Sequence, residues 1–276
     1  MKTQTKISKN KYKNINNIKK IVKATVIKII NLIYPKDDYC ICCDSFINSE
    51  SKYHICDSCI RKLQWINNVL CEKCGKMLDD EITGEILCYD CQENIRSFDK
   101  AYTCTRYGLY ERILISRFKE HKKSYIAESL ATIMYDRICL EYSSSDSTKK
   151  AYDVVIPIPI HKNKYKKRGF NQSENIAKVL AEKLGVLYDK NLLKREIETR
   201  SMKSLSSEER KRNIKNAFII ETYNKNLIKY NKVLLVDDIY TTGATLNEAS
   251  RVLKEAGVRE VYAITFSAGA NRIPIN

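Results

Sequence analysis

The sequence predicts an α/β domain with a parallel sheet covered on both faces, preceded by a small cysteine-rich module held together by metal. From about Ser97 onward, short apolar strands alternate with helical segments, which is typical of a parallel sheet. Nine of the eleven cysteines fall between Cys40 and Cys91, ahead of that region. We therefore expect three parts: a leader at residues 1–36, a cysteine module at 37–95 and an α/β domain at 96–276.

The leader is strongly basic. Residues 1–36 contain ten lysines and no Asp or Glu, so they supply +10 of the net charge of +16. Such a segment suits a polyanion, either nucleic acid or an anionic membrane surface, and it is equally compatible with a solvated tail in a Lys-rich chain. Apolar residues recur at helical spacing from 18 to 34, which favours a helix docked on the protein over a helix lying on a membrane.

No secretory signal or membrane span is predicted. Lys23 and Lys28 interrupt the apolar stretch, which is too short and too charged to cross a bilayer. The expected location is the cytoplasm, with the inner face of the membrane as an alternative.

The cysteine module contains four CxxC pairs. They are Cys40/Cys43, Cys56/Cys59, Cys71/Cys74 and Cys88/Cys91. Thiolates at this spacing chelate Zn²⁺ from a tight turn, and two pairs complete a tetrahedron, so we predict two structural zinc ions. Sequential pairing is the simplest arrangement, and an interleaved one has the same spacing. A redox or iron–sulfur role is the alternative, and Cys42 is a surplus thiol beside the first pair.

The remaining elements follow in order. We expect strands at 98–107, 154–160, 232–238 and 260–267, and helices near 110–118, 124–140, 172–184 and 244–256. A polar run at 143–150 is expected to be a loop.

The strongest motif is VLLVDDIYTTGAT, at residues 233–245. A buried strand would deliver Asp237 and Asp238 to the carboxyl edge of the sheet, where ligands bind in open α/β folds. Gly243 lets the backbone approach a phosphate, and the following helix directs its free N–H groups there. The predicted phosphate-binding residues are Thr241, Thr242, Gly243, Ala244 and Thr245. Because the paired carboxylates would repel phosphate, they suit ribose hydroxyls or hydrated Mg²⁺. An ordinary strand–turn–helix with an acidic turn is the alternative.

A second motif, PIPIHKNKYKKRGFNQS, spans residues 157–173. We expect a basic loop after a strand, ending at Arg168 and Gly169. Lys162, Arg168 and Gly169 are the predicted diphosphate-binding residues, since Arg and Lys clamp multiply charged phosphates. A solvated basic loop is the alternative.

These motifs carry a family resemblance. Residues 233–245 resemble the signature with which type I phosphoribosyltransferases bind 5-phosphoribosyl 1-diphosphate (PRPP). From about Leu32 to Phe266 the chain resembles the ComF-type competence family, through the helix ending at Tyr34-Pro35, the CxxC pairs, the PIPI strand with RGFNQS, and VDDIYTTGAT. The resemblance implies a type I phosphoribosyltransferase fold after a double zinc ribbon, PRPP with Mg²⁺ as ligand, and Asp237 and Asp238 as catalytic residues.

The resemblance also implies a mobile lid over residues 199–213. Thr199, Leu205, Arg210 and Asn213 match the family's segment, and Thr199, Arg210 and Asn213 are the predicted lid residues. Met202 stands where the family usually has Gln. The polar composition suits a mobile loop and equally a surface helix.

Two functions are compatible with the sequence. The first is a phosphoribosyltransferase that transfers ribose phosphate to an unidentified acceptor, linked through the family to DNA uptake. The second is a non-catalytic accessory protein that binds single-stranded DNA and senses a phosphorylated ligand in the same pocket. The family resemblance also makes a helicase-like competence protein a candidate partner.

Overall fold

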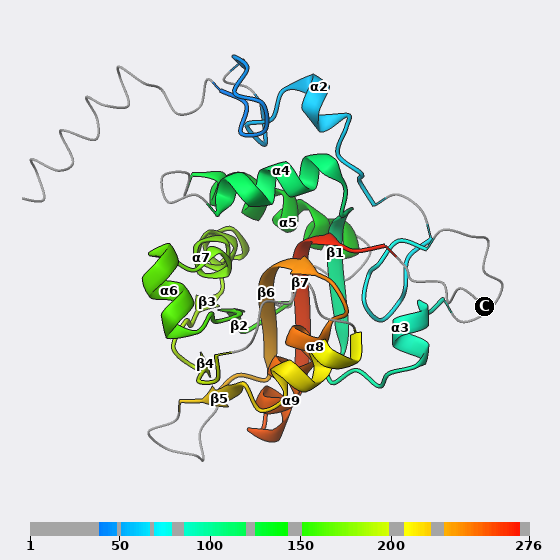
Figure 1. The fold of residues 1–276 in the computed structure, drawn as a ribbon, viewed down its shortest axis with the longest axis vertical. Coiled ribbons are helices and arrows are strands. Elements are labelled where there is room, and N and C mark those ends of the chain that lie inside the picture. The colour runs from blue at the N-terminus through cyan, green and yellow to red at the C-terminus, as the bar shows by residue number, and fades with distance from the viewer. Residues whose placement is uncertain are drawn as a thin grey trace, which may run out of the picture.

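The computed structural model describes residues 39–48, 51–66, 69–78, 86–119, 125–142, 151–198, 207–221 and 229–270. The predicted leader helix therefore lies outside the described residues. Within them, five parallel strands form one sheet in the order β1-β7-β6-β2-β3 (Figure 1). The strands are β1 (Lys100–Arg106), β2 (Val154–Pro157), β3 (Leu187–Tyr188), β6 (Lys232–Tyr240) and β7 (Glu260–Ala268). The parallel sheet predicted from the sequence is confirmed.

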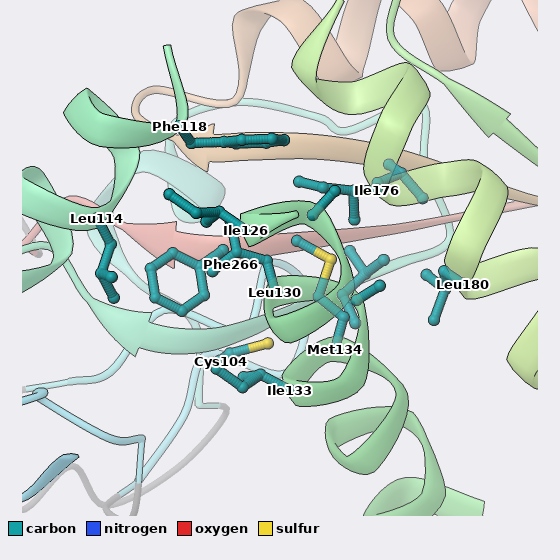
Figure 2. Close-up of a cluster of buried hydrophobic side chains, with 14 of the residues drawn as sticks. Cys104, Leu114, Phe118, Ile126, Leu130, Ile133, Met134, Ile176, Leu180 and Phe266 are labelled. Carbon is teal, nitrogen blue, oxygen red and sulfur yellow. The ribbon is translucent and has the colours of Figure 1, made fainter. Parts of the chain in front are cut away.

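Helices cover both faces of the sheet (Figure 1). One face carries α4 (Leu109–Phe118), α5 (Ile126–Tyr142) and α7 (Gln172–Leu184), and the other carries α8 (Ser207–Ile214) and α9 (Ala244–Glu255). On β6, Leu234 and Val236 belong to the first core, while Val233 and Leu235 belong to the second. Both sides of the strand are thus buried, which explains its continuous apolar run. Figure 2 shows the first core, which contains Met134 of α5, Leu180 of α7 and Phe266 of β7.

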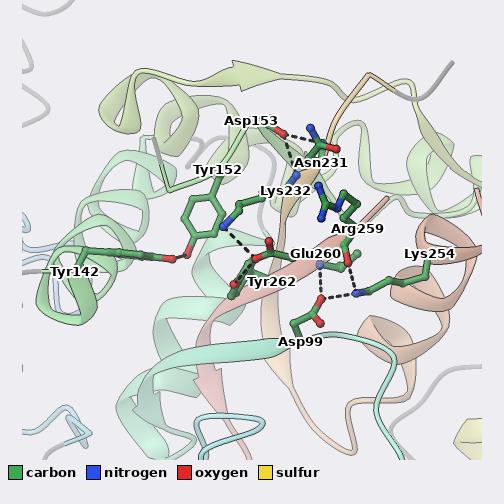
Figure 3. Close-up of polar contacts among 11 residues, drawn as sticks. Asp99, Tyr142, Tyr152, Asp153, Asn231, Lys232, Lys254, Arg259, Glu260 and Tyr262 are labelled. Carbon is green, nitrogen blue, oxygen red and sulfur yellow. Dashed lines mark hydrogen bonds and ion pairs between the residues drawn. The ribbon is translucent and has the colours of Figure 1, made fainter. Parts of the chain in front are cut away.

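Polar contacts fix the amino ends of the central strands (Figure 3). The Asp153 carboxylate accepts backbone hydrogen bonds from Asn231 (2.7 Å) and Lys232 (2.9 Å). The ammonium group of Lys232 lies 3.1 Å from the carboxylate of Glu260, which aligns β6 with β7. Because these contacts hold the register at one end, they also determine which side chains reach the opposite, carboxyl edge.

The cysteine module covers the edge strand β1. Trp65 forms an antiparallel bridge with Thr105, and the Arg106 N–H donates to the carbonyl of Gln64 at 2.8 Å. Further along, the Ala101 N–H donates to the carbonyl of Lys73 at 2.9 Å. An uncovered edge strand would expose unpaired backbone groups. The module provides hydrogen-bond partners for some of these groups on β1. Its two short helices are α2 (Asp57–Ile60) and α3 (Tyr89–Gln92).

The prediction of a basic loop at 162–168 is wrong, because these residues form helix α6 (Lys162–Arg168). The segment contains no Gly or Pro, its straight-chain Lys and Arg residues favour helix, and the His161 side chain caps it by accepting from the Asn163 N–H at 3.3 Å. The helix ends at Arg168 and is capped by Gly169, whose φ is 82°. A separate two-stranded antiparallel sheet of β4 (Leu193–Arg195) and β5 (Phe218–Ile220) was also not expected.

Candidate functional site

The two aspartates meet side chains from two other parts of the chain at the carboxyl end of β6. The Ser173 hydroxyl, in the first turn of α7, donates to Asp237 Oδ1 at 2.9 Å. The same oxygen accepts from the Asp238 N–H at 2.9 Å. On the other carboxylate, Asp238 Oδ2 lies 3.4 Å from Lys119 Nζ, directly after α4. The aspartates are therefore held from both sides.

Asp237 titrates near neutrality. Burial of the carboxyl group, together with the charge of Asp238, raises the pKa of Asp237 to about 7, and the Ser173 hydroxyl offsets this only in part. A bound cation or a hydroxyl donor would favour the ionised form. This acidic pair is consequently suited to a ligand that brings positive charge or hydrogen-bond donors.

The threonine loop lies at the start of α9. Gly243 precedes the helix with φ of 75°, and a β-carbon there would come within 2.2 Å of the Tyr240 hydroxyl oxygen. Thr242 is buried, with its hydroxyl 3.5 Å from the Ala244 N–H, whereas Thr241 is exposed and Thr245 half-buried. The first N–H groups of a helix lack partners within the helix, so this turn can bind an anion.

Cations gather on the β2 side of the aspartates. Burial and the guanidinium groups of Arg195 and Arg168 lower the pKa of Lys164. Burial also lowers the pKa of Arg195, which the charge of Asp237 partly offsets. Cations that destabilise one another in this way are relieved by an anionic ligand. Arg168 also donates to Gln172 Oε1 at 2.5 Å.

The predicted diphosphate-binding residues are distributed over α6. Lys162 begins the helix, Arg168 is its last residue and Gly169 follows it. Lys166, Lys167 and Arg168 lie in the last turn, where the helix dipole favours positive charge. Of the predicted set, Arg168 is the one whose charge acts on Lys164 and hence belongs to the cationic group beside Asp237.

Sequence reasoning missed three residues of this site. Ser173 is the last residue of the motif at 157–173. Its place in the first turn of the helix predicted from Gln172 was the signal that could have identified it. Neither Lys119 nor Arg195 carries a local signal, because tertiary structure alone brings them to the aspartates.

Part of the predicted lid is helical. Arg210 and Asn213 lie in α8, which packs beside α9, while Thr199 lies outside the described residues. Glu198 directly precedes the undescribed segment, and it accepts a hydrogen bond from the Asn163 side chain of α6. The chain entering the predicted lid is thus attached to the cationic side of the site.

The eight predicted metal ligands form two separate clusters, paired in sequence order. In each cluster the four sulfur atoms all lie within 4.8 Å of one another. The clusters are Cys40, Cys43, Cys56 and Cys59, and Cys71, Cys74, Cys88 and Cys91. The Cys43 and Cys56 sulfurs are 3.7 Å apart, and those of Cys74 and Cys88 are 3.5 Å apart.

These clusters fit zinc. A tetrahedron with Zn–S bonds of about 2.3 Å has sulfur atoms roughly 3.8 Å apart, close to the observed spacing. Four thiolates close the coordination sphere, so each ion would be structural. Cys42 is buried beside the first cluster without belonging to it, and His54 Nδ1 lies 3.2 Å from the Ser129 hydroxyl instead of joining the cysteines.

Known proteins match both parts of the chain. A double zinc ribbon domain matches residues 29–92, and a phosphoribosyl transferase domain matches residues 161–273. Competence protein F of Haemophilus influenzae is 31% identical over 211 residues, covering 76% of this chain and 89% of that protein. The chain belongs to the ComF competence protein family.

The alignments with other relatives of this ComF-family protein cover similar shares of the relatives' lengths. The DNA utilization protein YhgH of Salmonella typhimurium is 28% identical over 76% of this chain and 88% of that protein. Competence protein ComFC of Streptococcus pneumoniae is 29% identical over 86% of this chain and 90% of that protein. In the described residues of the ComF-family chain, no helix is both long and apolar enough to cross a membrane.

Proposed function

We propose that this ComF-family protein binds PRPP with Mg²⁺ at the carboxyl end of β6, and that this binding serves DNA uptake or utilisation. The observation that carries the proposal is the position of Asp237 and Asp238 near the end of β6, separated by two residues from a threonine loop that opens helix α9. The names of the relatives, competence proteins and DNA utilization proteins, support the connection to DNA.

Each part of the ligand has suitable partners. The 5-phosphate suits the N–H groups and hydroxyls of residues 241–245. The ribose hydroxyls can donate to Asp237 and Asp238, and the diphosphate suits Lys164, Arg168 and Arg195. Mg²⁺ bound with the sugar supplies positive charge that favours the ionised form of both carboxylates.

The site suits phosphoribosyl transfer by positioning and charge stabilisation. The bond between ribose C1 and the diphosphate oxygen breaks, a nucleophile bonds to C1, and the electron pair leaves with the diphosphate toward the cations of α6 and β4. Those cations stabilise the charge that develops on the leaving group, and no covalent enzyme intermediate is required.

Thermal unfolding tests the proposal. PRPP with Mg²⁺ should raise the melting temperature of the wild type because it binds only the folded state, and this shift should disappear in Asp237→Asn/Asp238→Asn. Glu128→Gln/Glu182→Gln removes the same charge from exposed positions on α5 and α7 and should retain the shift. A zinc-loaded wild type that shows no shift would refute PRPP binding.

A DNA-binding accessory role is the second candidate, favoured by the net charge of +16 and the ten lysines of residues 1–36. Binding to single-stranded DNA should then weaken steeply with salt, and deletion of residues 1–36 should reduce both the affinity and the salt slope. The accessory role requires DNA binding without PRPP turnover, whereas turnover without DNA supports the enzyme.

A further inference from the structure

The second cysteine cluster lies behind the threonine loop. The buried core that contains Cys71, Cys74, Cys88 and Cys91 also contains Phe98, Tyr240, Ala244 and Leu246. One hydrophobic core therefore joins the metal-binding turns to the end of β6 and the start of α9.

Tyr240 is the main contact between the cluster and the loop. Its ring is 1% exposed and meets the ring of Phe98 edge-on, with centroids 6.4 Å apart. Lys76 Nζ lies 5.4 Å from the ring centroid, and the hydroxyl end of the ring lies against Gly243. Any shift of this ring would therefore displace the glycine at which the phosphate-binding turn begins.

A buried ion pair connects the ring to the metal-binding turns. Lys76 Nζ lies 2.7 Å from Asp90 Oδ2, and the two side chains are only 1% and 8% exposed. Asp90 lies between Cys88 and Cys91, and Lys76 lies two residues after Cys74. The positions of both charges are thus set by turns that depend on metal for their fold.

A second contact reaches the first turns of α9. The Ser97 N–H donates to Asn247 Oδ1 at 2.7 Å, and the Asn247 N–H donates to the Gly243 carbonyl at 2.8 Å. Ser97 lies in the segment that joins the second cluster to β1. This segment therefore holds the helix whose start forms the anion-binding turn.

The first cluster differs in its position. Its cysteines pack with Ile41, Ile55 and Leu63 in the core on the opposite face of the sheet, with α4 and α5. It provides a comparison within the same chain, since it has the same chemistry but does not share a core with Tyr240.

We infer that Tyr240 and Asn247 are positioning residues through which the metal-bound second cluster fixes the conformation of loop 241–245. The inference rests on the proposed function, because the proposed function assigns PRPP to this loop as its ligand. Packing of the side chain, not a hydrogen bond, performs this role, because the buried Tyr240 hydroxyl has no hydrogen-bond partner among the described residues.

Amide hydrogen exchange of residues 239–247 tests the inference without any ligand. In the zinc-loaded protein, Tyr240→Leu should speed exchange of this segment about tenfold or more, while Tyr240→Phe should stay within about twofold of wild type. Asn247→Ala should also speed exchange, because it removes the bond from Ser97. Cys91→Ser at the second cluster should affect the segment, and Cys56→Ser at the first should not.

PRPP titration with Mg²⁺ supplies the second measurement. Tyr240→Leu should raise the Kd about tenfold or more, and Tyr240→Phe should leave it within about twofold. Unchanged exchange of residues 239–247 in folded Tyr240→Leu would overturn the inference, as would equal effects of Cys56→Ser and Cys91→Ser. If wild type binds no PRPP, the proposed function fails, and hydrogen exchange alone decides the inference.

Discussion

Lys76 and Asp90 form an ion pair of 2.7 Å in the interior of the cysteine module, where neither side chain is more than 8% exposed. Both charges have been removed from water, so each depends on the other. The ring of Tyr240 lies 5.4 Å from the ammonium group, measured to the ring centroid, and its hydroxyl end lies against Gly243.

Removal of one partner should therefore be costly. Lys76→Met leaves the Asp90 carboxylate buried and unpaired, and we expect it to lower the free energy of unfolding by about 3–5 kcal/mol. The double variant Lys76→Met/Asp90→Leu should recover much of this loss. Lys232→Met breaks a pair whose side chains are 43% and 36% exposed (Figure 3), and it should cost less than about 1 kcal/mol. Urea denaturation of all three zinc-loaded variants gives the comparison, and similar losses for Lys76→Met and Lys232→Met would contradict it.

Gly243 should tolerate no side chain. Gly243→Ala places a β-carbon at φ of 75° and within 2.2 Å of the Tyr240 hydroxyl oxygen. We expect about 1 kcal/mol of backbone strain and roughly 1–3 kcal/mol from displacement of the ring. Gly185→Ala has a similar φ of 65° but meets nothing within 4 Å, so it isolates the backbone contribution. Thermal unfolding should show the larger loss at Gly243, and equal losses would mean that Tyr240 moves aside freely.

Stability should depend on pH through Asp237. Its pKa is raised from 3.8 to about 7, chiefly by burial, so the folded state holds a proton that the unfolded state has released between these values. The stability associated with this proton is present below about pH 4 and is lost as the pH rises through about 7. Asp237→Asn keeps an oxygen acceptor for Ser173 and removes the titration. Its melting temperature relative to wild type should therefore rise between pH 5 and pH 8, whereas Glu182→Gln at an exposed site should show no such trend.

The sequence predicts the strand, the turn and the helix around Asp237 and Asp238 well because its signals there are local. The apolar run of β6, the paired aspartates and the glycine before α9 are contiguous, and the strand, the turn and the helix form where they are expected. The cysteine spacing likewise predicts both clusters, since each CxxC turn depends on only four residues.

Contacts between distant segments could not be predicted in the same way. Lys119 reaches Asp238 from the end of a helix more than a hundred residues earlier, and Arg195 approaches Asp237 from β4, which pairs with the distant strand β5. Helix α6 was missed because its cationic sequence resembles a solvated loop, although its residues have good helix propensity. The packing of the two clusters on opposite faces of the sheet depends on the edge position of β1, which the order of elements does not reveal.

The two clusters should release zinc at different rates. All four cysteines of the second cluster are buried, whereas Cys43 of the first is exposed and Cys56 is partly exposed. A chelator reaches the first site without disturbing the core, but the second opens only when the core shared with Tyr240 and Phe98 separates. Release to a chromophoric chelator should be biphasic, with rates at least about tenfold apart. In Cys43→Ser, the fast phase of zinc release should disappear and the slow phase should remain. Persistence of the fast phase in Cys43→Ser would assign it to the second cluster and show that burial does not protect that metal.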